Sequence, residues 1–395
     1  MIIKVIYIFI LFSFYASAQT DKYSIGGYAK YLFSSVKYPQ FDERYYDHLI
    51  HIRLNTKWYP LSNLTGTMEL RFRTYFGESV EDYSNYEGLI KSYQPLMNLD
   101  AFLWDDKSSI GYLEADRLYL DYYAEDLQAT LGRQRIAWGM SWVWNPLDIF
   151  NPRSVLDFDH EELSGVDALR LQYYTGAVSK VEIALAPARD KEYSSYAFLL
   201  SQNAFGYDFN FMGGFKRERW IIGTGWSGDI LDAGFRGEIT YSQNPKLITQ
   251  YDPIYSFYGK EALSANENNV LNFVISGDYT FQNSFYIHSE LLFNSNGKTE
   301  NAGLFNDEAY QLGMLSTAKW SLYQEFSYDI TPLIRGSVFA IINPNDKSFV
   351  IVPSISYSVI TNLDVFLIGL FFNGDHLTEY GDFGHYFYAR LKWSF

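Results

Sequence analysis

Few residues in this sequence have the types and spacing that metal or acid–base chemistry requires. His48 and His51 lie three residues apart, so on an extended strand their side chains point to opposite faces and cannot share a metal ion. A run of carboxylates offers oxygen ligands for Ca²⁺: Asp157, Asp159, Glu161 and Glu162. Because no EF-hand glycine accompanies this run, a solvated acidic loop is the better interpretation. We expect no metal site and no cofactor.

One group near the C terminus combines acids and bases of the kind that barrel proteases and lipases use: Asp375, His376, Asp382 and His385. No fixed spacing ties these residues together, so we do not expect an enzyme. The chain also has no Cys. This excludes disulfides, thiolate metal sites, cysteine nucleophiles and a lipid-anchored N-terminal Cys.

The composition excludes two further classes of protein. At 48% hydrophobic and 19% aromatic residues, the 395-residue chain is too apolar to be disordered. Its formal net charge of −15 argues against a nucleic-acid partner, because neutralising phosphates requires a basic surface.

The first 18 residues have the pattern of a secretory signal peptide. Lys4 supplies the positive charge, residues 5–15 are apolar, and Ala16-Ser17-Ala18 is a small-x-small cleavage site. The alternative is an anchor helix, but this apolar stretch falls well short of the roughly 20 residues that a spanning helix needs. We expect residues 19–395 to form a single domain.

Hydrophobic residues alternate with polar ones along most of the chain. In residues 50–58 one face carries Ile50, Ile52, Leu54 and Trp58, and the other carries His51, Arg53, Asn55 and Lys57. Such segments are about 10 to 13 residues long, whereas soluble strands cluster near 5 to 6 and a tilted membrane strand needs about 9 to 11. Trp and Tyr near the segment ends fit an interfacial girdle. The pattern predicts a transmembrane antiparallel β-barrel.

Eighteen segments fit this description, and sixteen strands remain the alternative because the segments between 194 and 227 are the weakest. They are 23–34, 47–59, 64–77, 113–124, 126–136, 165–174, 178–187, 194–203, 205–216, 218–227, 231–242, 268–280, 284–295, 314–328, 333–343, 348–359, 362–372 and 384–395. Short turns alternate with long connections, as in outer-membrane barrels with short periplasmic turns. An even count puts both termini on the periplasmic side.

Strand alternation assigns twelve bases and eight acids to the lumen. The residues that we expect to determine selectivity are Arg53, Lys57, Glu69, Arg71, Arg73, Arg117, Arg170, Arg236, Arg335 and Arg390. The modest positive excess favours anions, unless these charges only pair across strands and solvate the wall. Four predicted loops, 78–112, 154–165, 297–309 and 373–384, hold most of the net negative charge.

The connection 137–164 contains more large apolar residues than a loop in water tolerates, so we expect it to fold into the lumen. Its candidate constriction residues, with two from the strand before it, are Arg133, Arg135, Trp138, Trp142, Trp144, Asn145, Asp148 and Arg153. Its aromatic rings either stack on sugar rings or pack against the inner wall.

Two motifs resemble known outer-membrane proteins. The alternating end Tyr386-Phe387-Tyr388-Ala389-Arg390-Leu391-Lys392-Trp393-Ser394-Phe395 resembles the signal that the barrel-assembly machinery reads. Gly132-Arg133-Gln134-Arg135, Trp138-Gly139, Asn145-Pro146-Leu147-Asp148 and Asn151-Pro152-Arg153 are similar to a segment of the alginate-export-like porins. The best-known member of that family is an eighteen-stranded barrel that passes an anionic polysaccharide. This match covers about 22 residues, so the resemblance implies the fold and class but leaves the substrate open.

The sequence therefore predicts a porin in the outer membrane of a Gram-negative bacterium, for passive diffusion of small hydrophilic solutes that include anions or saccharides. The alternative is a plugged surface-binding barrel whose acidic loops bind a partner or divalent cations. Expected partners are outer-membrane lipid and lipopolysaccharide, the barrel-assembly machinery and the solute.

The terminal motif predicts the first experimental outcome. Deleting Phe395 or changing Phe395→Asp should lower the heat-modifiable folded band in outer membranes while the signal peptide is still removed. A normal folded yield from both variants would refute the assembly role of Phe395.

Overall fold

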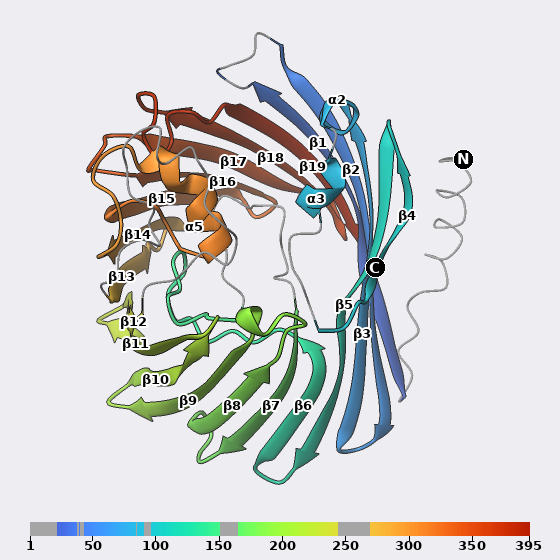
Figure 1. Cartoon of the computed structure of the whole chain (residues 1–395), viewed down its shortest axis with the longest axis vertical. Coiled ribbons are helices and arrows are strands. Elements are labelled where there is room, and N and C mark those ends of the chain that lie inside the picture. Colours follow the sequence, from blue (N-terminus) through green and yellow to red (C-terminus); the bar gives the residue numbers. More distant parts are fainter. Residues whose placement is uncertain are drawn as a thin grey trace.

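The computed structural model describes residues 22–37, 39, 43–83, 85–90, 96–150, 165–243 and 269–395. The predicted signal peptide lies outside these residues. In the part of the chain described, one antiparallel sheet closes into a barrel, and eighteen of its nineteen strands run round the wall (Figure 1). Within the same residues, no helix is long and apolar enough to cross a bilayer.

The strands of the wall follow one another in sequence order. They are β1 (Tyr23–Lys37), β2 (Tyr45–Leu61), β3 (Leu64–Gly77), β5 (Ser109–Ala124), β6 (Leu127–Gln134), β7 (Val166–Tyr174), β8 (Lys180–Ala186), β9 (Ser195–Ala204), β10 (Tyr207–Lys216), β11 (Arg219–Ile230), β12 (Ala233–Ser242), β13 (Val270–Thr280), β14 (Phe285–Asn294), β15 (Trp320–Thr331), β16 (Ile334–Ile342), β17 (Phe349–Ile360), β18 (Leu363–Asn373) and β19 (His385–Ser394). All eighteen predicted strands are present, which confirms the fold class and makes the sixteen-strand alternative wrong.

The barrel closes between its first and last strands. β1 pairs with β19 from Tyr28 opposite Ser394 to Lys37 opposite His385. The terminal Phe395 completes the seam, because its amide donates to the Gly27 carbonyl at 2.9 Å and its carbonyl accepts the Gly27 amide at 2.8 Å. No strand edge is left open at the seam, as a lipid environment requires.

The connection 78–112 was expected to be a loop, but it contains two short helices and a strand. These are α2 (Glu78–Asp82), α3 (Tyr86–Ile90) and β4 (Asp100–Asp106). β6 pairs with β5 only up to Leu118, because the chain leaves the wall after Gln134. β4 pairs with the remaining edge of β5 from Ser109 to Glu114 and thereby satisfies backbone groups that would otherwise be unpaired.

The outer surface of the barrel is apolar. Alternate residues of the strands expose large hydrophobic side chains, for example Leu118 and Leu120 on β5 and Phe198 and Leu200 on β9. Exposed aromatic residues gather near the strand ends, among them Tyr23, Trp58, Tyr122, Tyr173, Tyr328, Tyr357, Tyr196, Phe215, Tyr241 and Phe371. This band with aromatic residues at both ends is the surface that a barrel presents to a bilayer.

Connections at one end of the barrel are short, and most at the other end are long. The exception at the long end is the two-residue turn between β10 and β11, where Arg217 and Glu218 both have left-handed φ values of 52° and 62°. β15 begins at Trp320, later than predicted, because residues 313–319 leave the wall. Met314 and Leu315 line a pocket, and the Ser316 hydroxyl donates to Glu379.

The long connections before β15 and before β19 pack against each other. η3 (Ala302–Phe305) and α5 (Asn306–Leu312) lie inside the ring of strands in the view of Figure 1. The Asn306 side chain donates to the Glu379 carbonyl at 3.0 Å, and Ser316 donates to the Glu379 carboxylate at 2.7 Å. Glu379 is buried at this contact.

This contact predicts a pH dependence. Burial raises the pKa of Glu379 from 4.5 to about 7, and nearby Asp346 adds to the rise, outweighing the hydrogen bond from Ser316. The packed contact binds the proton of the Glu379 carboxyl group more tightly than an exposed loop would. The packed contact is therefore most stable below about pH 4.5, and its stability falls as the pH rises towards 7. The free energy of local opening should fall by up to about 3 kcal/mol across this window.

Hydrogen exchange of residues 374–384, corrected for intrinsic rates, measures this opening. Glu379→Gln should remove the dependence, whereas Asp375→Asn at an exposed neighbour should keep it. An opening free energy independent of pH in the unmodified protein would contradict the assignment.

Candidate functional site

The segment after β6 lies against the inner wall of the barrel. Trp138 and Trp144 are each only 2% exposed, and Leu147 is fully buried. Trp138 packs with residues of β7 to β11, while Trp144 packs with residues of β13 to β18. In Figure 1 this teal segment runs inside the ring of strands. The described residues 137–150 therefore occupy part of the lumen.

Two buried carboxylates hold this segment by its backbone. Glu238 of β12 accepts the amides of Met140, Ser141 and Leu147 at 2.5, 2.8 and 2.9 Å. A barrel interior leaves loop amides without strand partners, and a buried carboxylate needs donors, so each group satisfies the other.

Glu290 of β14 makes the same kind of contact with the next three residues. Its carboxylate accepts the amides of Trp142, Val143 and Trp144 at 3.3, 3.3 and 2.7 Å. Six amides between residues 140 and 147 are thus bound by two side chains, and strand alternation places both of these side chains on the lumen face.

A glycine surface on β11 allows the segment to approach the wall closely. A Cβ atom on Gly223 would lie 2.6 Å from Leu147 Cδ2, and one on Gly225 would lie 2.8 Å from Leu147 Cδ1. Any side chain at these inward positions would displace Leu147.

A third buried carboxylate joins the segment to the neighbouring strands. The Trp138 indole donates to Glu182 Oε1 at 2.7 Å, and Arg170 donates to the same oxygen at 2.5 Å. Lys180 lies 2.9 Å from Glu182 Oε2. Arg170, expected to line an open lumen, is thus part of the wall that carries the segment.

The arginines of β2, β3 and β5 form a cluster around Asp116. Arg53 donates to Asp116 at 2.7 Å, Arg71 donates to the other oxygen of Asp116, and Arg117 lies 3.2 Å from it. Asp116 is fully buried. One carboxylate therefore contacts three of the bases that we expected to face free water.

Two further acids complete this cluster. Glu69 accepts a hydrogen bond from Arg53, and Glu114 lies 2.9 Å from Arg73 and 3.5 Å from Arg71. Glu69, the one acid among the predicted selectivity residues, therefore shares these bases with Glu114 and Asp116.

Sequence alternation missed Asp116 and Glu114 because β5 contains a bulge. Glu69 pairs with Arg117, but the next residue of β3, Leu70, pairs with Ala115. The extra residue reverses which parity faces inward, so Glu114 and Asp116 share the lumen face with Arg117. An unbroken count could not place them there.

Other predicted lumen residues are also paired. Arg236 forms an ion pair with Asp278, and Arg335 lies 3.0 Å from Asp329 near the short-turn end. The Arg390 guanidinium lies 4.9 Å from the Phe366 ring centroid. Lys57 is exposed. The structure brings Arg53, Arg71, Arg73 and Arg117 together and leaves the remaining bases spread along the wall.

The predicted constriction residues fall in different places. Arg133 is not in the inward segment but in β6, where it lies 2.8 Å from Asp167 and donates to the Met97 carbonyl at 2.5 Å, beside the junction that β4 fills. Arg135 is exposed, and Arg153 lies outside the described residues. Asn145 and Asp148 line a pocket between the segment and the wall.

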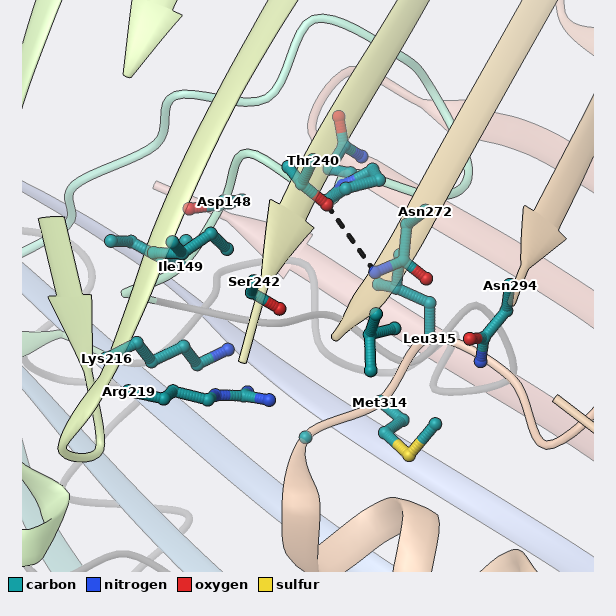
Figure 2. A pocket seen from close by; sticks show the side chains of 15 residues that line it. Asp148, Ile149, Lys216, Arg219, Thr240, Ser242, Asn272, Asn294, Met314 and Leu315 are labelled. Carbon is teal, nitrogen blue, oxygen red and sulfur yellow. Dashed lines mark hydrogen bonds between the residues drawn. The ribbon is translucent and has the colours of Figure 1, made fainter. Parts of the chain in front are cut away.

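This pocket contains a basic pair that we did not predict. Lys216 and Arg219 face each other across the β10–β11 ladder, and Figure 2 shows both side chains pointing into the cavity. Thr240 and Asn272, joined by a 3.5 Å hydrogen bond, line it beside them. Lys216 lies an even number of residues from the inward-facing Met212 of β10, so alternation carried to the strand end would have found it.

Among the described residues, the groups considered for chemistry lie at separate places. His376 Nδ1 lies 2.7 Å from Asp382 at an exposed position, whereas the His385 ring lies beside Phe371, with 5.8 Å between the ring centroids. Among the residues that the structure describes, no three His, Asp or Glu side chains are placed to hold a metal ion. The acidic run 157–162 lies outside them.

Comparison with known proteins agrees with this architecture. No family model and no curated protein matches the sequence. OccAB2 from Acinetobacter baumannii aligns over 95% of this chain and 98% of its own, with a TM-score of 0.57 and 10% identity. OccK5 (OpdH) from Pseudomonas aeruginosa gives a TM-score of 0.56 at 8% identity, covering 95% and 98%.

At these identities the likeness shows the fold alone. The chain has the closed eighteen-stranded antiparallel barrel of outer-membrane porins. The resemblance to alginate-export-like porins stays a prediction, since OccAB2 and OccK5 are Occ barrels.

The glycine surface predicts how the segment responds to mutation. Because the chain has no Cys, Ser141→Cys introduces a single thiol, and Ser141 is a residue of the segment itself that is only 9% exposed. Adding Gly223→Leu should displace Leu147 and raise the maleimide labelling rate at position 141 by about tenfold or more, as expected when a packed loop opens.

Gly277→Leu is the matched control, because the nearest atom to its Cβ would be 3.7 Å away. An equal labelling rate in the Gly223 and Gly277 variants would show that Leu147 does not depend on the glycine surface.

Proposed function

We propose that this protein is an outer-membrane channel through which small hydrophilic solutes diffuse passively, and that residues 137–150 narrow its pore. The observation that carries the proposal is a segment bound inside a closed barrel by Glu238 and Glu290. The apolar outer band supports a membrane location, and the charged inner wall supports a water-filled interior.

We further propose that anions are among the solutes. The cluster of Arg53, Arg71, Arg73 and Arg117 has one base more than its acids Glu69, Glu114 and Asp116. Lys216 and Arg219 line the pocket at the long-loop end together with a single acid, Asp148, so this pocket adds one base to the excess. Uncompensated bases in a narrow lumen lower the barrier for anions.

The second candidate function is a plugged barrel that binds a partner or divalent cations at its surface. α5 lies inside the ring of strands in Figure 1, and its packing against residues 374–384 favours this candidate. A plugged barrel would conduct no ions, whereas a porin conducts steadily, so planar-bilayer recording distinguishes the two.

The constriction predicts the effect of shortening the segment. Deleting Trp142 to Phe150 should raise single-channel conductance several-fold, because it removes the residues that Glu290 and Glu238 hold in the lumen. Heat-modifiable mobility of the variant controls for folding. Unchanged conductance in a folded variant would show that the segment does not limit the pore.

The charge excess predicts anion preference. Under a KCl gradient the reversal potential should report chloride over potassium, and Lys216→Ser with Arg219→Ser should shift it towards potassium. Arg335→Ser, which opens an exposed ion pair near the short-turn end, is the control and should shift it less. Arg71 and Arg73 are poorer test sites, since replacing them leaves Asp116 and Glu114 short of partners. A potassium-selective wild-type channel would contradict the proposal.

A further inference from the structure

Trp142 differs from the other tryptophans of the inward segment. Trp138 and Trp144 are each 2% exposed, whereas Trp142 is 55% exposed. The backbone at Trp142 is nevertheless held, since its amide donates to Glu290. A large indole ring is therefore exposed to solvent on a fixed backbone. Exposing so much apolar surface is unfavourable, and such exposed surface is typical of binding sites.

The position of the ring follows from its contact with β12. The Arg236 guanidinium carbon lies 5.0 Å from the Trp142 ring centroid. Arg236 is on the same inward face of β12 as Glu238 and two residues nearer the short-turn end. The Trp142 ring consequently lies against the inner wall, on the short-turn side of Glu238. A solute that passes the segment meets the ring there.

Hydrogen-bonding groups lie beside the ring. Arg236 pairs with Asp278 of β13, and these side chains are 18% and 17% exposed, so both reach water. Asp278 lies opposite His288 in the β13–β14 ladder, and Tyr286 is the next inward residue of β14. Neighbouring positions on one face of a sheet are about 5 to 8 Å apart. Two aromatic rings, Trp142 and Tyr286, thus flank one ion pair.

We propose that Trp142, Arg236, Asp278 and Tyr286 form a binding site for an uncharged sugar ring. The apolar C–H face of a pyranose stacks on the exposed indole, while its hydroxyls accept from Arg236 and donate to Asp278. Arg236 and Asp278 together carry no net charge, so this site recognises a neutral polyhydroxy ring and not an ion. The inference rests on the proposed channel function, because the solute must enter the lumen.

Planar-bilayer recording with maltotriose as the probe tests the site. Maltotriose should reduce the wild-type current in a saturable manner, and glycerol at equal osmolality should not. Trp142→Ala should raise the half-blocking concentration about tenfold, the change expected when about 1.4 kcal/mol of stacking free energy is lost. Trp142→Phe should retain most of the block, and Asp278→Asn should lose it. Trp58→Ala, on the lipid-facing side, is the matched control.

Two outcomes separate failure of the site from failure of the channel. A wild-type channel that conducts but responds to maltotriose no differently from Trp142→Ala overturns the sugar site and leaves the channel function intact. If the barrel does not conduct, calorimetric titration of the detergent-folded protein with maltotriose decides the site alone. Saturable heat that Trp142→Ala removes supports the site, and its absence overturns it.

Discussion

Buried carboxylates that accept backbone amides are the interaction on which the lumen depends. Glu238 and Glu290 project from strands of the wall and bind six amides of residues 140–147. A loop inside a barrel cannot pair its amides with a sheet, and a carboxylate removed from water needs several donors. The two requirements meet here, so an irregular segment becomes a fixed part of the interior. The small inward face of Gly223 and Gly225 then lets Leu147 pack on the wall.

Charge on the inner wall is largely balanced within the wall. Asp116 contacts Arg53, Arg71 and Arg117, and Glu182 contacts Arg170 and Lys180. Such pairs fix side chains across strands and reduce the field that a permeating ion meets. The excess that remains is small, which is why the pocket pair Lys216 and Arg219 matters for selectivity. A neutral sugar site at Trp142 is compatible with this balance, since it does not depend on net charge.

The strands could be predicted from the sequence because alternation over about ten residues reports directly which face meets lipid. The inward path of residues 137–150 was indicated by their tryptophans. Their partners were not, because nothing local links Trp144 to Glu290, which lies far along the chain. Asp116 could not be placed in the lumen because a one-residue bulge in β5 reverses which residues face inward. β4 could not be predicted because it pairs with an edge of β5 that is open only where β6 leaves the wall. The basic pair at Lys216 and Arg219 was within reach of the same alternation, had it been carried to the strand end.

The most direct test of this account is the single-channel conductance of the double variant Glu238→Leu and Glu290→Leu. Both changes remove acceptors without adding bulk, so the segment should leave the wall and the conductance should become larger and noisier than that of the wild type. Ile239→Leu, a change on the lipid-facing side of β12 beside Glu238, should conduct like the wild type. A folded double variant with wild-type conductance would contradict the claim that these two carboxylates hold the segment that sets the pore.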